Sequence, residues 1–267
     1  MPTVDLPHGR FHYEDAGGSG LPVLALHGTF GRGRTFAALA ERLLPDYRVL
    51  APDLRGHGLT RARGDFGREA FVEDAAHFVE ALNLAPVLLY GHSLGGVTAY
   101  QLAARRPELV RAVVVEDVGA VTDESAVPEP VLDVTGWPRR FASQAEAVEF
   151  FAATPAPEYF LESVVDGELL FDLATMMRVQ EGNRGVWWTD WEAVRCPMLL
   201  LRANNSFLLG PELAAEMVRR SPGTELVVFD GTGHWIHRAV GTREGPDGCA
   251  AAIRAFFGRT TSRRPGG

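Results

Sequence analysis

The sequence has little cysteine and no long apolar run, and both absences narrow the class of protein. Two cysteines, Cys196 and Cys249, occur among 267 residues, which is too few for a disulfide framework and gives no metal-site spacing. No apolar run could span a bilayer, and residues 1–20 lack the basic start and apolar stretch of a secretory signal. We therefore expect a soluble cytoplasmic protein with no membrane partner.

The sequence also lacks an excess of basic residues. Lys and Arg number 26 against 34 Asp and Glu, for a net charge of -8, which disfavours nucleic acid as a partner. Hydrophobic residues make up 46% and charged residues 22%, the balance of a globular protein. A chain of this length suits one domain, residues 1–267, with a large core. Residues 259–267 are polar and basic and end in Pro-Gly-Gly, which predicts a disordered tail.

Short apolar runs alternate with longer amphipathic stretches, the pattern of strands and helices in a mostly parallel α/β sheet. The apolar runs predict strands at 11–15, as an edge strand, and at 22–26, 47–51, 87–90, 110–115, 198–201 and 225–229. The amphipathic stretches predict helices at 35–44, 68–82, 94–105, 212–220 and 248–257.

This alternation is interrupted over residues 122–191, which are rich in proline and aromatic residues and read as helical. We interpret the segment as a helical lid inserted into a core of residues 1–121 and 192–258. A lid after a strand's carboxyl end would lie above the edge where open α/β sheets bind ligands. Most of its aromatic residues are expected to pack the lid onto the core, around an apolar pocket.

The stretch from Tyr90 to Gly96 joins the end of an apolar run to a glycine-rich turn. A strand that turns sharply into a helix strains the backbone of the turning residue and lifts its side chain above the sheet edge. Such a turn needs residues without bulk two positions before and after, and here they are Gly91 and Gly95. Ser93 is therefore the predicted nucleophile. The alternative is a chance glycine turn after a buried strand.

Several motifs occur together in one order along the chain. They are His27-Gly28, Asp53 to Gly58, Gly91 to Gly95, and Asp230-Gly231-Thr232-Gly233-His234. With these motifs the chain resembles the α/β-hydrolase fold family over about residues 11–257. The resemblance implies a mostly parallel central sheet flanked by helices, a nucleophile elbow, a catalytic triad and an oxyanion hole.

A serine hydroxyl needs a base that removes its proton as it attacks, and the usual base is histidine. Of the eight histidines, His234 and His237 follow the last predicted strand, where the hydrolase fold returns its histidine to the serine. His234 carries the Gly-x-Gly-His pattern and is the predicted base. His237 is the alternative, and is otherwise expected to be solvated or to contact the lid.

A carboxylate must orient the histidine, and here the sequence departs from the family. The loop after the strand at 198–201 usually holds this acid, yet Asn205 occupies the expected position. Some family members place the acid after the strand that follows the elbow helix, which in this chain ends in Glu116-Asp117. Asp117 matches the position that these members use and comes at the strand's end, so it is the predicted triad acid, with Glu116 as the second choice. Neighbouring strand residues point to opposite faces, so only one of the two is expected to serve.

The oxyanion formed by attack on a carbonyl requires fixed hydrogen-bond donors. The resemblance implies the backbone amide of Leu94, next to Ser93, and an amide from the loop after His27-Gly28. Thr29 is the expected second donor, with Phe30 next in line.

Together these residues predict a serine hydrolase acting on a small, largely apolar ester or lactone through an acyl-enzyme intermediate. No motif indicates a metal or a nucleotide cofactor, so we expect neither. Esters, lactones, thioesters and carbon–carbon bonds all suit this machinery. Two alternatives stay open: a carbon–carbon hydrolase or lyase using the same triad, and a non-catalytic member that binds a small molecule, suggested by Asn205.

Overall fold

The computed structural model describes residues 2–238 and 246–262. Its main sheet runs in the order β1-β2-β4-β3-β6-β7-β10-β11, with β5 paired to β2 beside this path. The strands of this sheet are β1 (Thr3–Leu6), β2 (Gly9–Asp15), β3 (Leu21–Leu26), β4 (Tyr47–Pro52), β5 (Arg61–Ala62), β6 (Val87–His92), β7 (Val110–Glu116), β10 (Met198–Ala203) and β11 (Thr224–Phe229).

The strands from β4 and β3 to β11 pair in parallel, whereas β2 runs antiparallel to β4 and β1 antiparallel to β2. The register places Leu26 beside Gly91, and Glu116 beside both His92 and Leu201. The carboxyl ends of β3, β6, β7 and β10 therefore meet at one edge of the sheet. The prediction that residues 11–15 form the edge strand is wrong, because the short and largely exposed β1 pairs with the outer side of β2.

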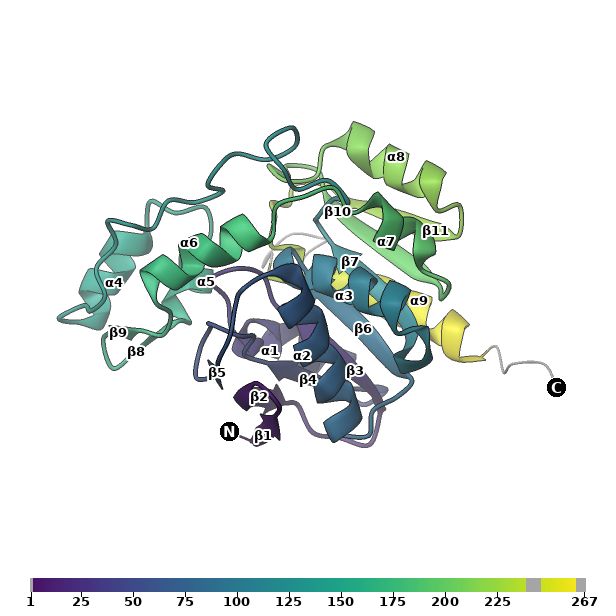
Figure 1. The fold of residues 1–267 in the computed structure, drawn as a ribbon, viewed down its shortest axis with the longest axis horizontal. Coiled ribbons are helices and arrows are strands. Elements are labelled where there is room, and N and C mark those ends of the chain that lie inside the picture. Colours follow the sequence, from purple (N-terminus) through teal and green to yellow (C-terminus); the bar gives the residue numbers. More distant parts are fainter. Residues whose placement is uncertain (1, 239–245, 263–267) are drawn as a thin grey trace.

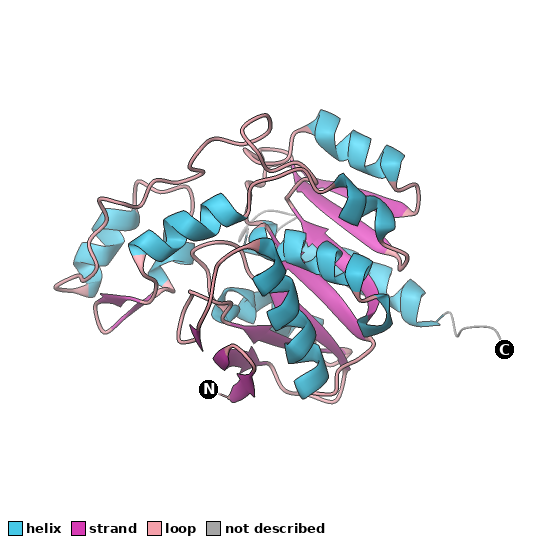
Figure 2. Cartoon of the chain, viewed as in Figure 1, coloured by secondary structure: helices cyan, strands magenta, loops and turns pink. Residues whose placement is uncertain are grey.

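Helices cover both faces of the sheet (Figures 1 and 2). On one face lie α2 (Arg68–Ala81) and α3 (Leu94–Arg105); on the other lie η1 (Gly33–Phe36), α1 (Ala37–Leu43) and α9 (Pro246–Ser262). The two-residue period of a strand divides the core accordingly: Leu89 packs with α2 and α3, and its neighbour Leu88 packs with α1 and α9.

The helix α9 continues through Ser262. The prediction of a disordered tail from residue 259 is therefore wrong for residues 259–262, and residues 263–267 lie outside the described residues. The helix α8 (Pro211–Arg220) packs beside β11. None of the helices in the described ranges combines the length and apolar character needed to cross a membrane.

Residues 122–187, here called the cap segment, project to one side of the sheet in Figure 1. They contain α4 (Gln144–Phe151), α5 (Pro157–Leu161), β8 (Val164–Val165), β9 (Glu168–Leu169) and α6 (Leu173–Gly182). Their aromatic side chains pack largely on one another, as where Phe151 stacks on Phe160 with ring centroids 5.6 Å apart. The next helix, α7 (Trp188–Ala193), lies on the core instead, where Trp191 packs against Tyr100 of α3.

Candidate active site

Ser93 occupies the sharp turn between β6 and α3. Its backbone has φ 53° and ψ -118°, a conformation that L-residues rarely adopt. A Cβ on Gly91 would lie 2.3 Å from the carbonyl oxygen of Gly95, and a Cβ on Gly95 would lie 2.0 Å from that of Leu26. Both glycines are therefore required for the turn, as the Gly-x-Ser-x-Gly spacing predicts.

Asp117 follows β7 directly, in a left-handed conformation with φ 51°, and its side chain is fully buried. Its Oδ2 accepts a hydrogen bond from Nδ1 of His234 at 2.8 Å and from the hydroxyl of Ser206 at 2.7 Å. Its Oδ1 accepts a hydrogen bond from the backbone amide of Ala203 at 2.8 Å. These donors compensate the burial of the carboxylate and fix it against His234.

Ser206 is a site residue that the sequence reasoning missed. Its hydroxyl oxygen accepts hydrogen bonds from the amides of Leu208 and Leu209, which directs its hydrogen to Asp117. Asn205, at the position where an acid was sought, is exposed, and its backbone amide donates to Thr232. The loop after β10 thus contributes donors to Asp117. A serine beside the missing acid was the only signal of this arrangement in the sequence.

Glu116 and His237 form a second buried acid–histidine pair behind the first. Glu116 accepts hydrogen bonds from Nδ1 of His237 at 2.8 Å, from its backbone amide at 3.1 Å, and from the hydroxyl of Tyr90. Burial opposes ionisation, but the charge of His237 and these hydrogen bonds hold the Glu116 pKa below its usual range. The expectation that His237 is solvated or contacts the lid is wrong, because the turn after His234 folds inward onto Glu116.

His92 lies between the two pairs, with its ring centroid 4.5 Å from that of His234 and 4.9 Å from that of His237. Its Nε2 bonds the backbone carbonyl of His234 at 3.0 Å. A carbonyl only accepts, so Nε2 carries the hydrogen and Nδ1 is unprotonated. Burial, together with the two neighbouring histidines, places the His92 pKa well below its usual range.

His92, Glu116 and His237 bring potential metal-ligand atoms within 4.8 Å of one another, a grouping that the sequence did not indicate. The Glu116 oxygens, however, already accept hydrogen bonds from the Tyr90 hydroxyl and from the backbone amide and Nδ1 of His237. These hydrogen bonds account for Glu116 and His237 without an ion.

The amides of Leu94, Thr29 and Phe30, the expected oxyanion donors, have no hydrogen-bond partner within the described ranges. Leu94 is the first residue of α3, so its amide belongs to the positive end of the helix dipole. Thr29 and Phe30 lie in a turn closed by a hydrogen bond of 3.1 Å from the Gly31 amide to the Gly28 carbonyl. This turn borders the same cavity as Ser93.

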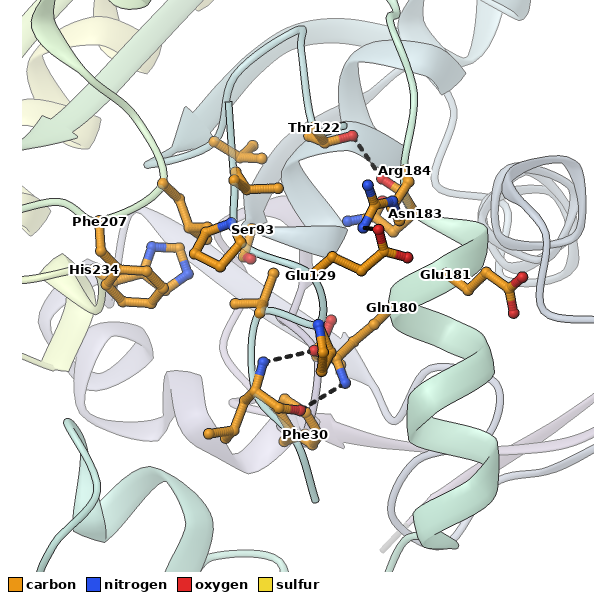
Figure 3. A pocket seen from close by; sticks show the side chains of 18 of the residues that line it. Phe30, Ser93, Thr122, Glu129, Gln180, Glu181, Asn183, Arg184, Phe207 and His234 are labelled. Atoms are coloured by element: carbon orange, nitrogen blue, oxygen red, sulfur yellow. Dashed lines mark hydrogen bonds and ion pairs between the residues drawn. The ribbon is translucent and has the colours of Figure 1, made fainter. Parts of the chain in front are cut away.

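A cavity of about 430 Å³ opens above Ser93 and His234, within the range of small-molecule sites. Its walls are mainly apolar and include Phe30, Phe160 and Leu208. Figure 3 shows Ser93 and His234 on one side and, opposite them, charged side chains such as Glu129 and Arg184. Arg184 forms ion pairs of 2.6 Å with Glu124 and with Glu129. The Ser93 hydroxyl bonds none of the described residues, so it is available to a ligand.

A sequence model of the alpha/beta hydrolase family matches residues 23–252. The chain belongs to the alpha/beta hydrolase family. Membership agrees with the parallel sheet, the flanking helices and the strained turn at Ser93.

Relatives within the alpha/beta hydrolase family include enzymes named as lipases and esterases. Lipase LipV of Mycobacterium tuberculosis is 31% identical over 92% of this chain and 97% of its own. Esterase YbfF of Escherichia coli is 24% identical over 88% of this chain and 92% of its own. These relatives support the prediction of a hydrolase that acts on ester bonds.

A solved structure from the same fold is also similar over nearly the whole chain. The crystal structure of E-2-(acetamidomethylene)succinate hydrolase has a TM-score of 0.87 and 26% sequence identity. The match covers 96% of this chain and 98% of that one.

Proposed function

We propose that the protein is a serine hydrolase that cleaves a small, largely apolar carboxylic ester or lactone through an acyl-enzyme intermediate. The observation that carries the proposal is the 2.8 Å hydrogen bond between Asp117 and Nδ1 of His234, at a cavity that Ser93 also lines. Because a carboxylate accepts, Nδ1 carries the hydrogen, which leaves Nε2 of His234 as the base.

In the first half-reaction the Ser93 hydroxyl oxygen attacks the carbonyl carbon, and Nε2 of His234 accepts the hydroxyl proton. Asp117 orients the ring and stabilises the imidazolium that forms. The amides of Leu94 and Thr29, with Phe30 as a further donor, stabilise the oxyanion. When the carbon–oxygen bond breaks, His234 gives the proton to the leaving alkoxide, and the acyl group stays on Ser93.

In the second half-reaction water replaces the alcohol. Nε2 of His234 takes a proton from the water as its oxygen attacks the acyl carbon. Collapse of the second tetrahedral intermediate returns the proton to Ser93 and releases the carboxylic acid. For a lactone the alcohol and the acid belong to one product molecule.

The cavity supports a substrate of limited size with a largely apolar body. Its volume of about 430 Å³ and its apolar walls, Phe30, Phe160 and Leu208 among them, favour burial of hydrocarbon groups. The charged side chains opposite Ser93 balance one another, since Arg184 is paired with Glu129. An uncharged acyl or alcohol group fits this environment better than an ion.

The test compares wild-type protein with Ser93→Ala on p-nitrophenyl butyrate and on a small lactone. Wild-type protein is expected to hydrolyse one or both, and Ser93→Ala to lose the activity. The matched control is Ser125→Ala, which removes an exposed serine hydroxyl that bonds Asp123. Cleavage by Ser93→Ala at the wild-type rate would contradict the proposal.

The same assay, with a diketone added as a third substrate, separates the two alternatives. A carbon–carbon hydrolase or lyase would leave both esters intact and would release a ketone from a diketone in a Ser93-dependent or His234-dependent reaction. A non-catalytic binding protein would cleave none of these compounds. The suggestion of simple binding came from Asn205, which stands where an acid was expected. The hydrogen bond from His234 to Asp117 supports catalysis instead, because Asp117 supplies the missing carboxylate.

A further inference from the structure

Two hydroxyl groups of the cap segment bind three consecutive carbonyls of the turn that holds Thr29 and Phe30. The single hydroxyl hydrogen of Tyr159 is shared between the carbonyl oxygens of Gly28 at 2.9 Å and Thr29 at 3.1 Å. The hydroxyl of Ser163 donates to the carbonyl oxygen of Phe30 at 2.9 Å. Tyr159 is 1% exposed and Ser163 is fully buried, so water does not compete for these bonds.

The planarity of the peptide group converts these carbonyl contacts into a constraint on the amides. In a trans peptide the carbonyl oxygen and the following amide hydrogen point in opposite directions. A Gly28 carbonyl held toward Tyr159 turns the Thr29 amide away from Tyr159, and a held Thr29 carbonyl does the same for the Phe30 amide. Thr29 and Phe30 border the cavity with Ser93, whereas Tyr159 is not among its described lining residues. The amides of Thr29 and Phe30 therefore point away from Tyr159.

The turn needs such support because Phe30 has φ 71°, a left-handed conformation that a phenylalanine adopts at a cost. The Gly28 carbonyl has further donors, Nδ1 of His27 at 2.7 Å and the Gly31 amide at 3.1 Å. Within the described ranges, the carbonyl of Thr29 is bonded by Tyr159 alone and that of Phe30 by Ser163 alone. The peptide between Thr29 and Phe30 thus depends on the cap segment for its orientation.

The turn after α5 is itself tied to the core on the side of the catalytic histidine. Arg32 donates to the backbone carbonyl of Glu162 at 3.2 Å, and Arg238 donates to the Glu162 carboxylate at 2.7 Å. Arg238 also donates to Thr35 of η1 at 3.2 Å. These contacts hold Ser163 in place beside the oxyanion turn.

We propose that Tyr159 and Ser163 are positioning residues of the cap segment. Tyr159 orients the Thr29 and Phe30 amides toward the oxyanion, and Ser163 holds the Phe30 carbonyl and with it the left-handed conformation of Phe30. This inference rests on the proposed function. Neither side chain touches the reacting atoms in this account. Their hydroxyls keep the donor peptides in the orientation that the transition state requires, so that little reorganisation is needed during the reaction.

The experiment measures hydrolysis of p-nitrophenyl butyrate by wild-type protein, Tyr159→Phe, Ser163→Ala and the double variant. The control is Thr154→Val, which removes a cap-segment hydroxyl that bonds the Phe151 carbonyl in the turn after α4. Loss of a complete oxyanion donor costs about a hundredfold to a thousandfold in kcat, so misorientation in Tyr159→Phe is expected to cost about tenfold or more. KM is expected to stay within about twofold, because the ground-state substrate does not carry the oxyanion charge.

A second readout uses a trifluoromethyl ketone, whose adduct with Ser93 carries an oxyanion. Its Kd is expected to rise in Tyr159→Phe by the factor by which kcat/KM falls. An unchanged kcat, or a change confined to KM or to the unfolding temperature with unchanged ketone affinity, would overturn the inference. If the variants give that result while the wild-type protein hydrolyses the ester in a Ser93-dependent reaction, the proposed function still stands. Wild-type protein that cleaves no ester rejects the proposed function and this inference with it.

Discussion

Asp117 holds the position on which the chemistry of His234 depends. Its carboxylate only accepts hydrogen bonds, and it receives them from Ala203, Ser206 and His234. An asparagine at this position would replace one carboxylate oxygen by an NH2 group, which is a donor and would face one of these three donors. The ring of His234 would then adopt the other tautomer, with its hydrogen on the nitrogen that should act as base.

We therefore predict that Asp117→Asn lowers kcat by about ten thousandfold, the cost of a wrong histidine tautomer in such triads. The measurement is steady-state hydrolysis of p-nitrophenyl butyrate. Asn205→Ala is the matched control, because Asn205 is exposed and stands where the resemblance to the fold family led us to look first for the acid. If the Asn205 variant lost activity and the Asp117 variant kept it, our assignment of the acid would be wrong.

At the residue scale, the sequence predicted Ser93, His234 and Asp117 as neighbours, and the structure brings Asp117 to His234 and places Ser93 and His234 at one cavity. It could not predict the partners that depend on side-chain direction. Glu116 was weighed as an alternative to Asp117, and strand periodicity does turn it to the other side, where it binds His237. Neither that pairing nor the donor role of Ser206 follows from local sequence, because residues distant along the chain complete both.

The turn that joins β6 to α3 has no space for a side chain at Gly91 or Gly95. A Cβ at Gly95 would meet the backbone of Leu26 at 2.0 Å, and backbone atoms of a central strand cannot move aside without disturbing the sheet. The nucleophile turn is therefore sterically dependent on β3, the neighbouring strand of β6.

We predict that Gly95→Ala destabilises the fold by about 3 kcal/mol or more, toward the upper end of overpacking effects. Gly223→Ala is the control, because a Cβ at Gly223 meets no atom within 4 Å. Its unfolding free energy should change by less than about 0.5 kcal/mol, as at other open surface positions. Urea unfolding measures both, and equal stability of the two variants would contradict this account of the turn.

At the element scale, apolar runs located β3, β4, β6, β7 and β10 well because both faces of these strands are largely buried. The strand β11 was also located by its apolar residues, although Leu226 and Val228 are exposed. The prediction failed for β1, whose residues are mostly exposed and give no clear period. It also failed for the end of α9, where the polar residues 259–262 continue the helix. In both places tertiary contacts, rather than a local hydrophobic pattern, decide the structure: β1 pairs with β2, and Arg259 forms an ion pair with Glu225.

The molecule as a whole buries several uncharged histidines, which makes its stability depend on pH. Burial lowers the pKa of His27 to about 3, and burial, together with the repulsion that a protonated His57 would meet from a protonated His27, lowers the pKa of His57 to about 3, from an ordinary value of 6.5. Below pH 6.5 the unfolded chain binds protons at these positions and the folded chain does not. Folding stability is therefore complete above about pH 6.5 and is lost as the pH falls toward 3.

We predict that the unfolding free energy falls by up to about 1.4 kcal/mol per pH unit for each such histidine below pH 6.5. His57→Gln should reduce this slope by about 1.4 kcal/mol per pH unit, since one titrating group is removed. Urea unfolding at pH 7, 6 and 5 measures the slope in both proteins. Identical slopes for the variant and the wild-type protein would show that His57 does not stay neutral in the folded state.

In the proposed reaction of the whole molecule, Ser93 is a nucleophile activated by His234 and Asp117. Treatment with a fluorophosphonate followed by mass spectrometry of the intact protein and its peptides tests this claim most directly. We expect one adduct, located on Ser93, which forms in the wild-type protein and is strongly slowed in Asp117→Asn. A protein that stays unlabelled, or that carries its adduct on another residue, would contradict the account.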